Sequence, residues 1–168
     1  MERGATYKLF VHSAGVNTGK GSFPTHVWLA YLEDLNEQTV WTNVSEPLEA
    51  VDGSAGHALH IAIRTAIDHL PDNCTALLFS PQEQITAIYR VSREKRRQDK
   101  YRGSNKKLRP SADLIMDNDN VMEARGIALV VRPPEEHHEY DMVNVTLRVE
   151  AQDRWQRACR AAESKFGV

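Results

Sequence analysis

The pattern of hydrophobic and polar positions predicts strands in the first part of the chain and helices later. Three runs rich in β-branched and aromatic residues come early, and each has the length of a strand: Thr6–His12, Thr25–Leu32 and Gln38–Val44. The polar stretch Glu33–Glu37 between the second and third runs is typical of a hairpin turn. The first third of the chain therefore predicts an antiparallel meander.

Helical periodicity begins after this meander. Apolar residues recur at intervals of three and four in the segment Ser54–Leu70, at Leu59, Ala62, Ile63, Ala66, Ile67 and Leu70. The continuous apolar run Thr75–Phe79 predicts a central strand that is covered on both faces. A second helix is expected to begin at Ser80, because Ser80 and Glu83 have capping-box spacing and Pro81 suits a first turn.

The remaining pattern predicts a helix over Ala112–Glu123, a strand over Gly126–Val131, a loop over Pro133–His138 and a C-terminal helix over Asp141–Lys165. The expected order is thus βββ-α-β-α-α-β-α. Three antiparallel strands followed by α-β units predict a mixed five-stranded sheet with helices on both faces. We expect one α/β domain over residues 1–168.

Composition places the chain among ordinary globular domains. It has 168 residues, of which 41% are hydrophobic and 26% charged. Its two cysteines, Cys74 and Cys159, are far apart and form neither a disulfide framework nor a zinc pattern. Because Met1–Thr6 lacks the apolar core of a signal peptide and no run reaches the roughly 20 apolar residues of a membrane span, we expect a cytoplasmic protein without a membrane partner.

Charge changes this picture, because it is strongly segregated. The segment Arg90–Arg109, called the basic arm below, holds ten Lys or Arg residues against Glu94 and Asp99, a local charge of +8. The net charge of the chain is −2, so the rest of it carries −10. Clustered cations of this kind indicate phosphate contacts. We therefore predict that the arm binds nucleic acid through Arg93, Lys95, Arg96, Arg97, Lys100, Arg102, Lys106, Lys107 and Arg109, with Tyr101 as a stacking surface.

The element order and several local phrases resemble ribonuclease H over roughly residues 7–162. Leu9–Gly15 stands where that family has a strand ending in Asp-Gly-Ser, and Leu77–Gln82 where it has a strand ending in Thr-Asp-Ser. Ala66–Leu70 is similar to the end of the family's first helix. The stretch from Tyr89 to Leu114 is similar to its basic protrusion, and Val130–Asn144, which contains His138, to its last strand and histidine-bearing loop.

The resemblance implies two divalent metal ions held by four carboxylates, but this chain departs from the pattern at all four positions. His12, Leu59, Pro81 and Arg148 stand where the carboxylates are expected. Two-metal chemistry needs negative charge to hold hard cations about 3.5–4 Å apart, and Arg148 would add a permanent cation instead. We therefore expect no catalytic residues of the family type, no metal site and no cofactor. The resemblance also implies phosphate contacts from Asn17 and Lys20 in the glycine-rich loop after the first strand.

Three interpretations of function remain open. The first is a catalytically inactive ribonuclease-H-like module, a pseudoenzyme that binds a nucleic-acid duplex or an RNA/DNA hybrid through the arm without sequence specificity. The second is a divergent ribonuclease H that uses Mg²⁺ or Mn²⁺ in a site rebuilt from His12, His60, Glu83 and His138. The third is a protein-interaction module whose arm docks an acidic protein partner. A separate acidic cluster, Asp113, Asp117, Asp119 and Glu123, is expected to form a solvated helix face and turn instead of a metal site.

Overall fold

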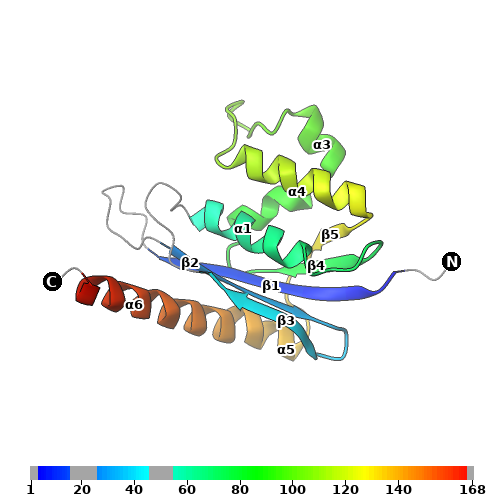
Figure 1. The fold of residues 1–168 in the computed structure, drawn as a ribbon. Coiled ribbons are helices and arrows are strands. Elements are labelled where there is room, and N and C mark those ends of the chain that lie inside the picture. The colour runs from blue at the N-terminus through cyan, green and yellow to red at the C-terminus, as the bar shows by residue number, and fades with distance from the viewer. Residues whose placement is uncertain (1–3, 16–25, 46–54, 166–168) are drawn as a thin grey trace.

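The computed structural model describes residues 4–15, 26–45 and 55–165, and contains a single five-stranded sheet in that part of the chain (Figure 1). The strand order is β3-β2-β1-β4-β5. β1 pairs antiparallel with β2, and β2 antiparallel with β3, whereas β1, β4 and β5 are mutually parallel. The strands are β1 (Thr6–Gly15), β2 (His26–Glu33), β3 (Thr39–Val44), β4 (Thr75–Phe79) and β5 (Ala128–Val131). The predicted meander and mixed sheet are confirmed.

Helices cover both faces of the sheet, as predicted. α1 and α4 lie on one face with α3 beyond them, and α6 runs along the other face (Figure 1). The helices are α1 (Ala55–Ile67), α2 (Glu83–Arg90), α3 (Arg93–Gln98), α4 (Ala112–Arg125), α5 (His137–Asp141), the π-helical turn η2 (Met142–Thr146) and α6 (Leu147–Lys165). None of the helices in the described ranges is both long enough and apolar enough to cross a bilayer.

The alternation of side chains along β1 separates two hydrophobic cores. Leu9 and Val11 belong to the larger core, which α1 and α4 complete. Phe10 lies on the opposite face, where it stacks on Phe79 at 5.0 Å between ring centroids and packs with Leu147 of α6. Because both faces of β1 are buried, its sequence reads as a nearly continuous apolar run.

The structure differs from the predicted elements at three boundaries. α2 begins at Glu83 instead of Ser80, and Gln82 precedes it without a side-chain cap. The Ser80 hydroxyl instead accepts a hydrogen bond from the Gln82 N–H at 3.1 Å, so the predicted capping box is wrong. The basic arm contains the extra helix α3. The last helical segment begins at His137, because Glu136 and Glu139 form a reciprocal capping box there.

Candidate nucleic-acid interface

The basic arm is a short helix followed by a small hairpin. Ser92 caps α3, its hydroxyl accepting a hydrogen bond from the Lys95 N–H at 3.2 Å. After α3 the chain turns back on itself: the Gly103 N–H donates to the Lys107 carbonyl at 2.9 Å, and Arg102 forms an isolated antiparallel bridge with Leu108. Backbone hydrogen bonds thus order the turns of the arm, although its sequence has few apolar residues that could pack in a core.

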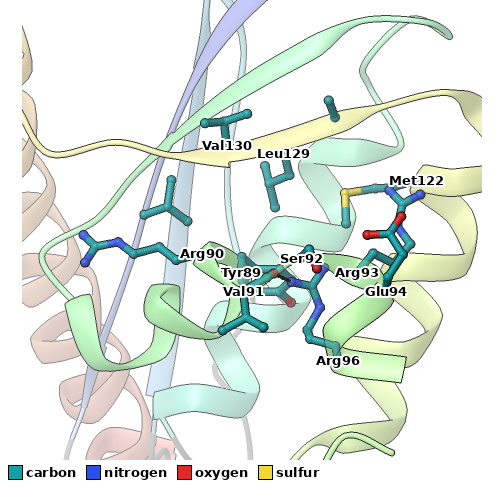
Figure 2. Close-up of a pocket in the computed structure, with 12 residues that line it drawn as sticks. Tyr89, Arg90, Val91, Ser92, Arg93, Glu94, Arg96, Met122, Leu129 and Val130 are labelled. Atoms are coloured by element: carbon teal, nitrogen blue, oxygen red, sulfur yellow. Dashed lines mark hydrogen bonds between the residues drawn. The ribbon is translucent and has the colours of Figure 1, made fainter. Parts of the chain in front are cut away.

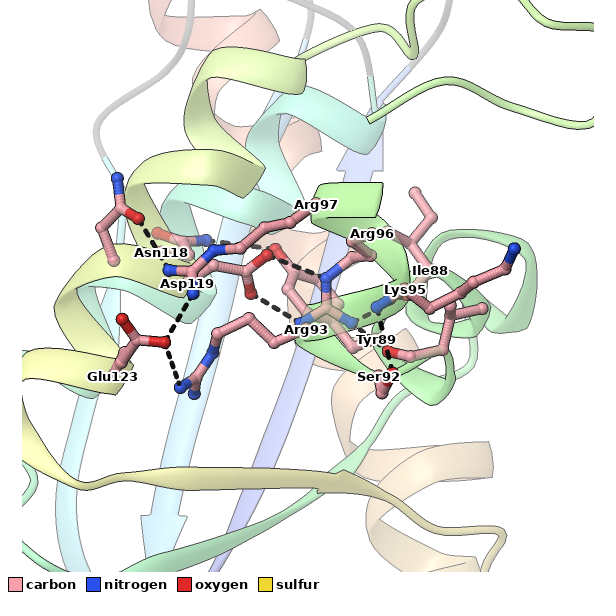
Figure 3. Close-up of polar contacts among 12 residues, drawn as sticks. Ile88, Tyr89, Ser92, Arg93, Lys95, Arg96, Arg97, Asn118, Asp119 and Glu123 are labelled. Carbon is pink, nitrogen blue, oxygen red and sulfur yellow. Dashed lines mark hydrogen bonds and ion pairs between the residues drawn. The ribbon is translucent and has the colours of Figure 1, made fainter. Parts of the chain in front are cut away.

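A buried ion pair anchors this arm to α4 (Figure 3). The Arg96 guanidinium donates through Nε to Asp119 Oδ2 at 2.9 Å and through Nη2 to Asp119 Oδ1 at 2.6 Å. Its Nη1 donates to the carbonyls of Ile88 and Val91, at the end of α2. Two parallel bonds to one carboxylate fix the planar guanidinium in orientation. Arg96 therefore joins α2, α3 and α4 at a single point.

Aromatic rings complete the surroundings of this pair. The Tyr101 hydroxyl donates to Asp119 Oδ2 at 3.1 Å, and the Arg96 guanidinium carbon lies 5.4 Å from the centroid of the Tyr89 ring. Burial and the neighbouring Asp119 carboxylate raise the pKa of Tyr101. Arg96 is 8% exposed and Tyr101 5% exposed. The prediction that these two side chains meet phosphates or bases is wrong for this conformation, because both are used to hold the arm in place.

Three other cations of the arm have acidic partners. Arg97 pairs with Glu123 at 2.5 Å, and the Arg93 guanidinium lies 3.6 Å from the same carboxylate. Lys95 pairs with Asp99 at 3.1 Å. These contacts lie at the surface, where ion pairs contribute about 0–1 kcal/mol, so they reduce the local charge without fixing the side chains.

Five of the predicted phosphate contacts have no acidic partner among the described residues, namely Lys100, Arg102, Lys106, Lys107 and Arg109; Arg90, at the start of the arm, has none there either. Three of them, Arg102, Lys106 and Arg109, line an open pocket of about 510 Å³ together with Asp99. The Arg102 guanidinium is oriented by a hydrogen bond to the Lys106 carbonyl at 3.1 Å. These five are the predicted phosphate contacts whose charge the structure leaves uncompensated; Arg109 is half-buried and the other four are exposed. Asn17 and Lys20 lie outside the described residues.

The positions at which the resemblance implies catalytic carboxylates make other contacts in the structure. His12 on β1 bonds through Nδ1 to the Gln82 side-chain oxygen at 2.9 Å, and the Ser13 N–H donates to that same oxygen at 2.7 Å. Because this oxygen is an acceptor, His12 carries its proton on Nδ1. Burial lowers the pKa of His12, the Gln82 bond opposes that shift, and the charge of Arg148 lowers the pKa further.

These residues do not fit the metal ions that the family resemblance implies. Leu59 is fully buried in the larger core, Pro81 occupies the turn after β4, and Arg148 supplies positive charge near His12. Hard divalent cations prefer carboxylate and carbonyl oxygens. Across the described ranges, no three His, Cys, Asp or Glu side chains come together in a metal-binding arrangement.

The second predicted set, for a rebuilt nuclease site, is also dispersed. His60 is buried in the α1 face, where its Nδ1 lies 2.7 Å from the Tyr89 hydroxyl. His138 pairs with Glu33 at 2.6 Å and meets the edge of the Phe10 ring on the other face of the sheet. Glu83 is exposed at the start of α2. The prediction that these residues join His12 in one site is therefore wrong, because His60 lies on the other face of the sheet from His12 and His138, and no three such side chains come together among the described residues.

The buried state of His60 gives a prediction about pH. Burial, with a smaller contribution from His57, lowers the pKa of His60 from 6.5 to about 4. Between these values the unfolded chain binds a proton that the folded chain does not, so folding stability falls as the pH drops from 6.5 to 4. We expect His60 to account for a loss of about 3 kcal/mol in unfolding free energy over this window. Urea denaturation at several pH values, compared with His60→Gln, measures it; an equal loss in both proteins would contradict the prediction.

Solved structures that resemble this chain show which fold these elements make. One is a foamy viral protease-reverse transcriptase in complex with double-stranded DNA, 12% identical, with a TM-score of 0.53, covering 94% of this chain and 95% of that one. The same viral protein in complex with an RNA/DNA hybrid gives a TM-score of 0.54 at 12% identity, covering 90% of this chain and 20% of that one. LC11-RNase H1, isolated from compost by a metagenomic approach, gives 0.51 at 12% identity, covering 87% and 98%.

The fold is ribonuclease-H-like, and the strand order 3-2-1-4-5 of the mixed sheet agrees with it. No family model and no curated protein matches the sequence. At 12% identity, the structural likeness concerns the path of the backbone. What this chain does depends on its own side chains.

Proposed function

We propose that this chain is a nucleic-acid-binding ribonuclease-H-like module that holds a duplex or an RNA/DNA hybrid by its phosphates and does not cut it. The observation that carries the proposal is the set of five uncompensated cations between Lys100 and Arg109, on an arm that a buried ion pair holds in position. Fixed cations lose less freedom on binding than mobile ones, which favours association. Phosphate contacts carry no sequence information, so binding without sequence specificity is expected.

The foamy viral relative in complex with double-stranded DNA and with an RNA/DNA hybrid supports the choice of a duplex as the ligand. The electrostatics of the arm support it as well. Lys100, Lys106 and Lys107 are exposed. Lys106 also lines a pocket together with Arg102 and Arg109. Clustered cations of this kind suit a duplex backbone, which carries a high density of negative charge.

Removal of three arm charges tests the proposal. In the variant Lys100→Ala/Lys106→Ala/Lys107→Ala, we expect affinity for a hybrid duplex to fall at least about tenfold at 0.1 M salt, because three phosphate contacts are lost. The matched control is Arg154→Ala/Arg157→Ala/Arg160→Ala, which removes the same charge from exposed positions on α6. Fluorescence anisotropy with a labelled hybrid measures both. Equal weakening in the two variants would show that only net charge matters and would refute a role for the arm.

The absence of cutting is a separate proposal with its own test. It rests on the chemistry of His12, Leu59, Pro81 and Arg148, which offer no carboxylate for a two-metal site. We expect purified protein to leave a labelled RNA/DNA hybrid intact with either Mg²⁺ or Mn²⁺. The same protein with His12→Ala serves as the control for contaminating nuclease. Cutting by the native chain that His12→Ala abolishes would contradict the proposal.

A further inference from the structure

The free edge of the sheet at β5 borders a pocket of about 460 Å³ that the proposed function does not use (Figure 2). β5 forms one side of this pocket, and the junction between α2 and α3 forms the other. β5 is the last strand in the sheet order and pairs on one side with β4. Its other side faces the pocket.

The backbone of β5 has hydrogen-bonding groups to offer on that side. The Ala128 N–H donates to the Cys74 carbonyl and the Arg132 N–H to the Leu78 carbonyl, which turns the even-numbered residues toward β4. The N–H and C=O of Leu129 and Val131 therefore point away from β4, and no backbone partner is found for them among the described residues. An exposed row of such groups is a template for another strand.

The opposite wall of the pocket holds the two arginines Arg90 and Arg93, together with the single carboxylate of Glu94. Arg90 is exposed at the end of α2 and has no acidic partner in the described ranges. Arg93 donates through Nη2 to the Ile127 carbonyl at 3.3 Å, while its buried Nε has no hydrogen-bond partner among the residues that the structure describes. A buried N–H without an acceptor costs about 1–3 kcal/mol. A carboxylate brought into the pocket would supply the missing acceptor and match the charge.

We propose that an extended acidic peptide segment of a partner protein adds to the sheet as a strand beside β5. Its backbone pairs with Leu129 and Val131. Side chains of an extended strand alternate between two faces. Those turned toward the α2–α3 junction are carboxylates that meet Arg90 and Arg93, and those on the other face lie beside Val130. Main-chain pairing supplies affinity and alternate side chains supply selectivity, as in other strand-addition complexes.

The probe for this site is a fluorescein-labelled hexapeptide of alternating glutamate and valine. We expect it to bind the native protein, and Val131→Pro to weaken binding at least about tenfold, because proline removes an outward N–H and is tolerated at a sheet edge. The matched control is Val131→Ala, which keeps the N–H and should bind within about threefold of native. Binding of a hybrid duplex should be unchanged in Val131→Pro, which also reports that the variant is folded.

A second measurement does not depend on any variant. In the native protein, saturating peptide should slow hydrogen exchange of the Leu129 and Val131 amides at least about tenfold, since both become hydrogen-bonded. A peptide with lysine in place of glutamate should bind at least about tenfold more weakly. Unchanged exchange at both amides, or equal binding by Val131→Pro and the native protein, would overturn the proposal and leave the nucleic-acid proposal standing.

Discussion

Replacing Asp119 with alanine is expected to lower the unfolding free energy by about 3–5 kcal/mol, because it leaves the Arg96 guanidinium buried without its counter-charge. Asp119 is fully buried and accepts hydrogen bonds from both Arg96 and Tyr101, so the prediction that it lies on a solvated helix face is wrong. Urea denaturation followed by circular dichroism measures the change. A variant of the exposed pair, Glu123→Ala, is the matched control on the same helix and should cost about 0–1 kcal/mol.

The double variant Arg96→Met/Asp119→Leu removes both charges of the buried pair and leaves the other contacts of the arm in place. Hydrophobic replacement of a buried ion pair is often neutral or stabilising, so the double variant should recover much of the stability lost in Asp119→Ala. A cost below about 1 kcal/mol for Asp119→Ala would mean that the pair is solvated, and the account of an anchored arm would be wrong.

Introducing a carboxylate at position 59 is expected to prevent stable folding instead of restoring a catalytic site. Leu59 has no exposed surface and packs in the core shared by α1 and the sheet. An unpaired carboxylate there must either lose its hydration or become protonated, and we expect Leu59→Glu to cost at least about 4 kcal/mol. Thermal denaturation and soluble yield measure the effect.

The control for this variant conserves volume and polarity. Leu59→Met should cost less than about 1.5 kcal/mol, because methionine fills a similar space. If Leu59→Glu were as stable as Leu59→Met, position 59 would face an open cleft, and the physical argument against a carboxylate site would fail at that position. The two variants thus distinguish a packed core from a vacated active site.

The sequence predicted the architecture well because local pattern determined it. The runs around Leu9, Leu29 and Leu78 are strands in the structure, and the antiparallel and parallel pairings follow from their order. Boundaries were less predictable where a side chain had two possible uses. Ser80 has the spacing of a helix cap, yet its hydroxyl closes the turn before Gln82 and α2 begins three residues later.

The interface was predicted only in part, because charge along a sequence does not distinguish an exposed cation from a buried one. Arg96 and Lys100 read alike in the arm, yet one is buried against Asp119 and the other is exposed. One signal was present: Asp119 lies on the same face of α4 as Ile115 and Met122, both buried. A carboxylate on an apolar helix face requires a cationic partner, and the basic arm was the nearest source.

The sequence also did not predict which face of the sheet each histidine occupies. His12 and His60 were grouped because the family resemblance brings their segments near one site. The structure places them on opposite faces of the sheet, since His12 follows Phe10 by two residues on β1 while His60 faces Tyr89 under α4. Which face a side chain occupies depends on strand register and helix rotation, and a one-residue difference reverses it.

The central claim is that the arm binds phosphate, and the salt dependence of hybrid binding tests it most directly. Five uncompensated cations predict that log K falls with log salt with a slope of about −4 for the native protein. In Lys100→Ala/Lys106→Ala/Lys107→Ala, the slope should become shallower by about 2–3, whereas the control with three arginines of α6 replaced should keep the native slope. A native slope near zero, or the same slope in the native protein and the arm variant, would contradict the account.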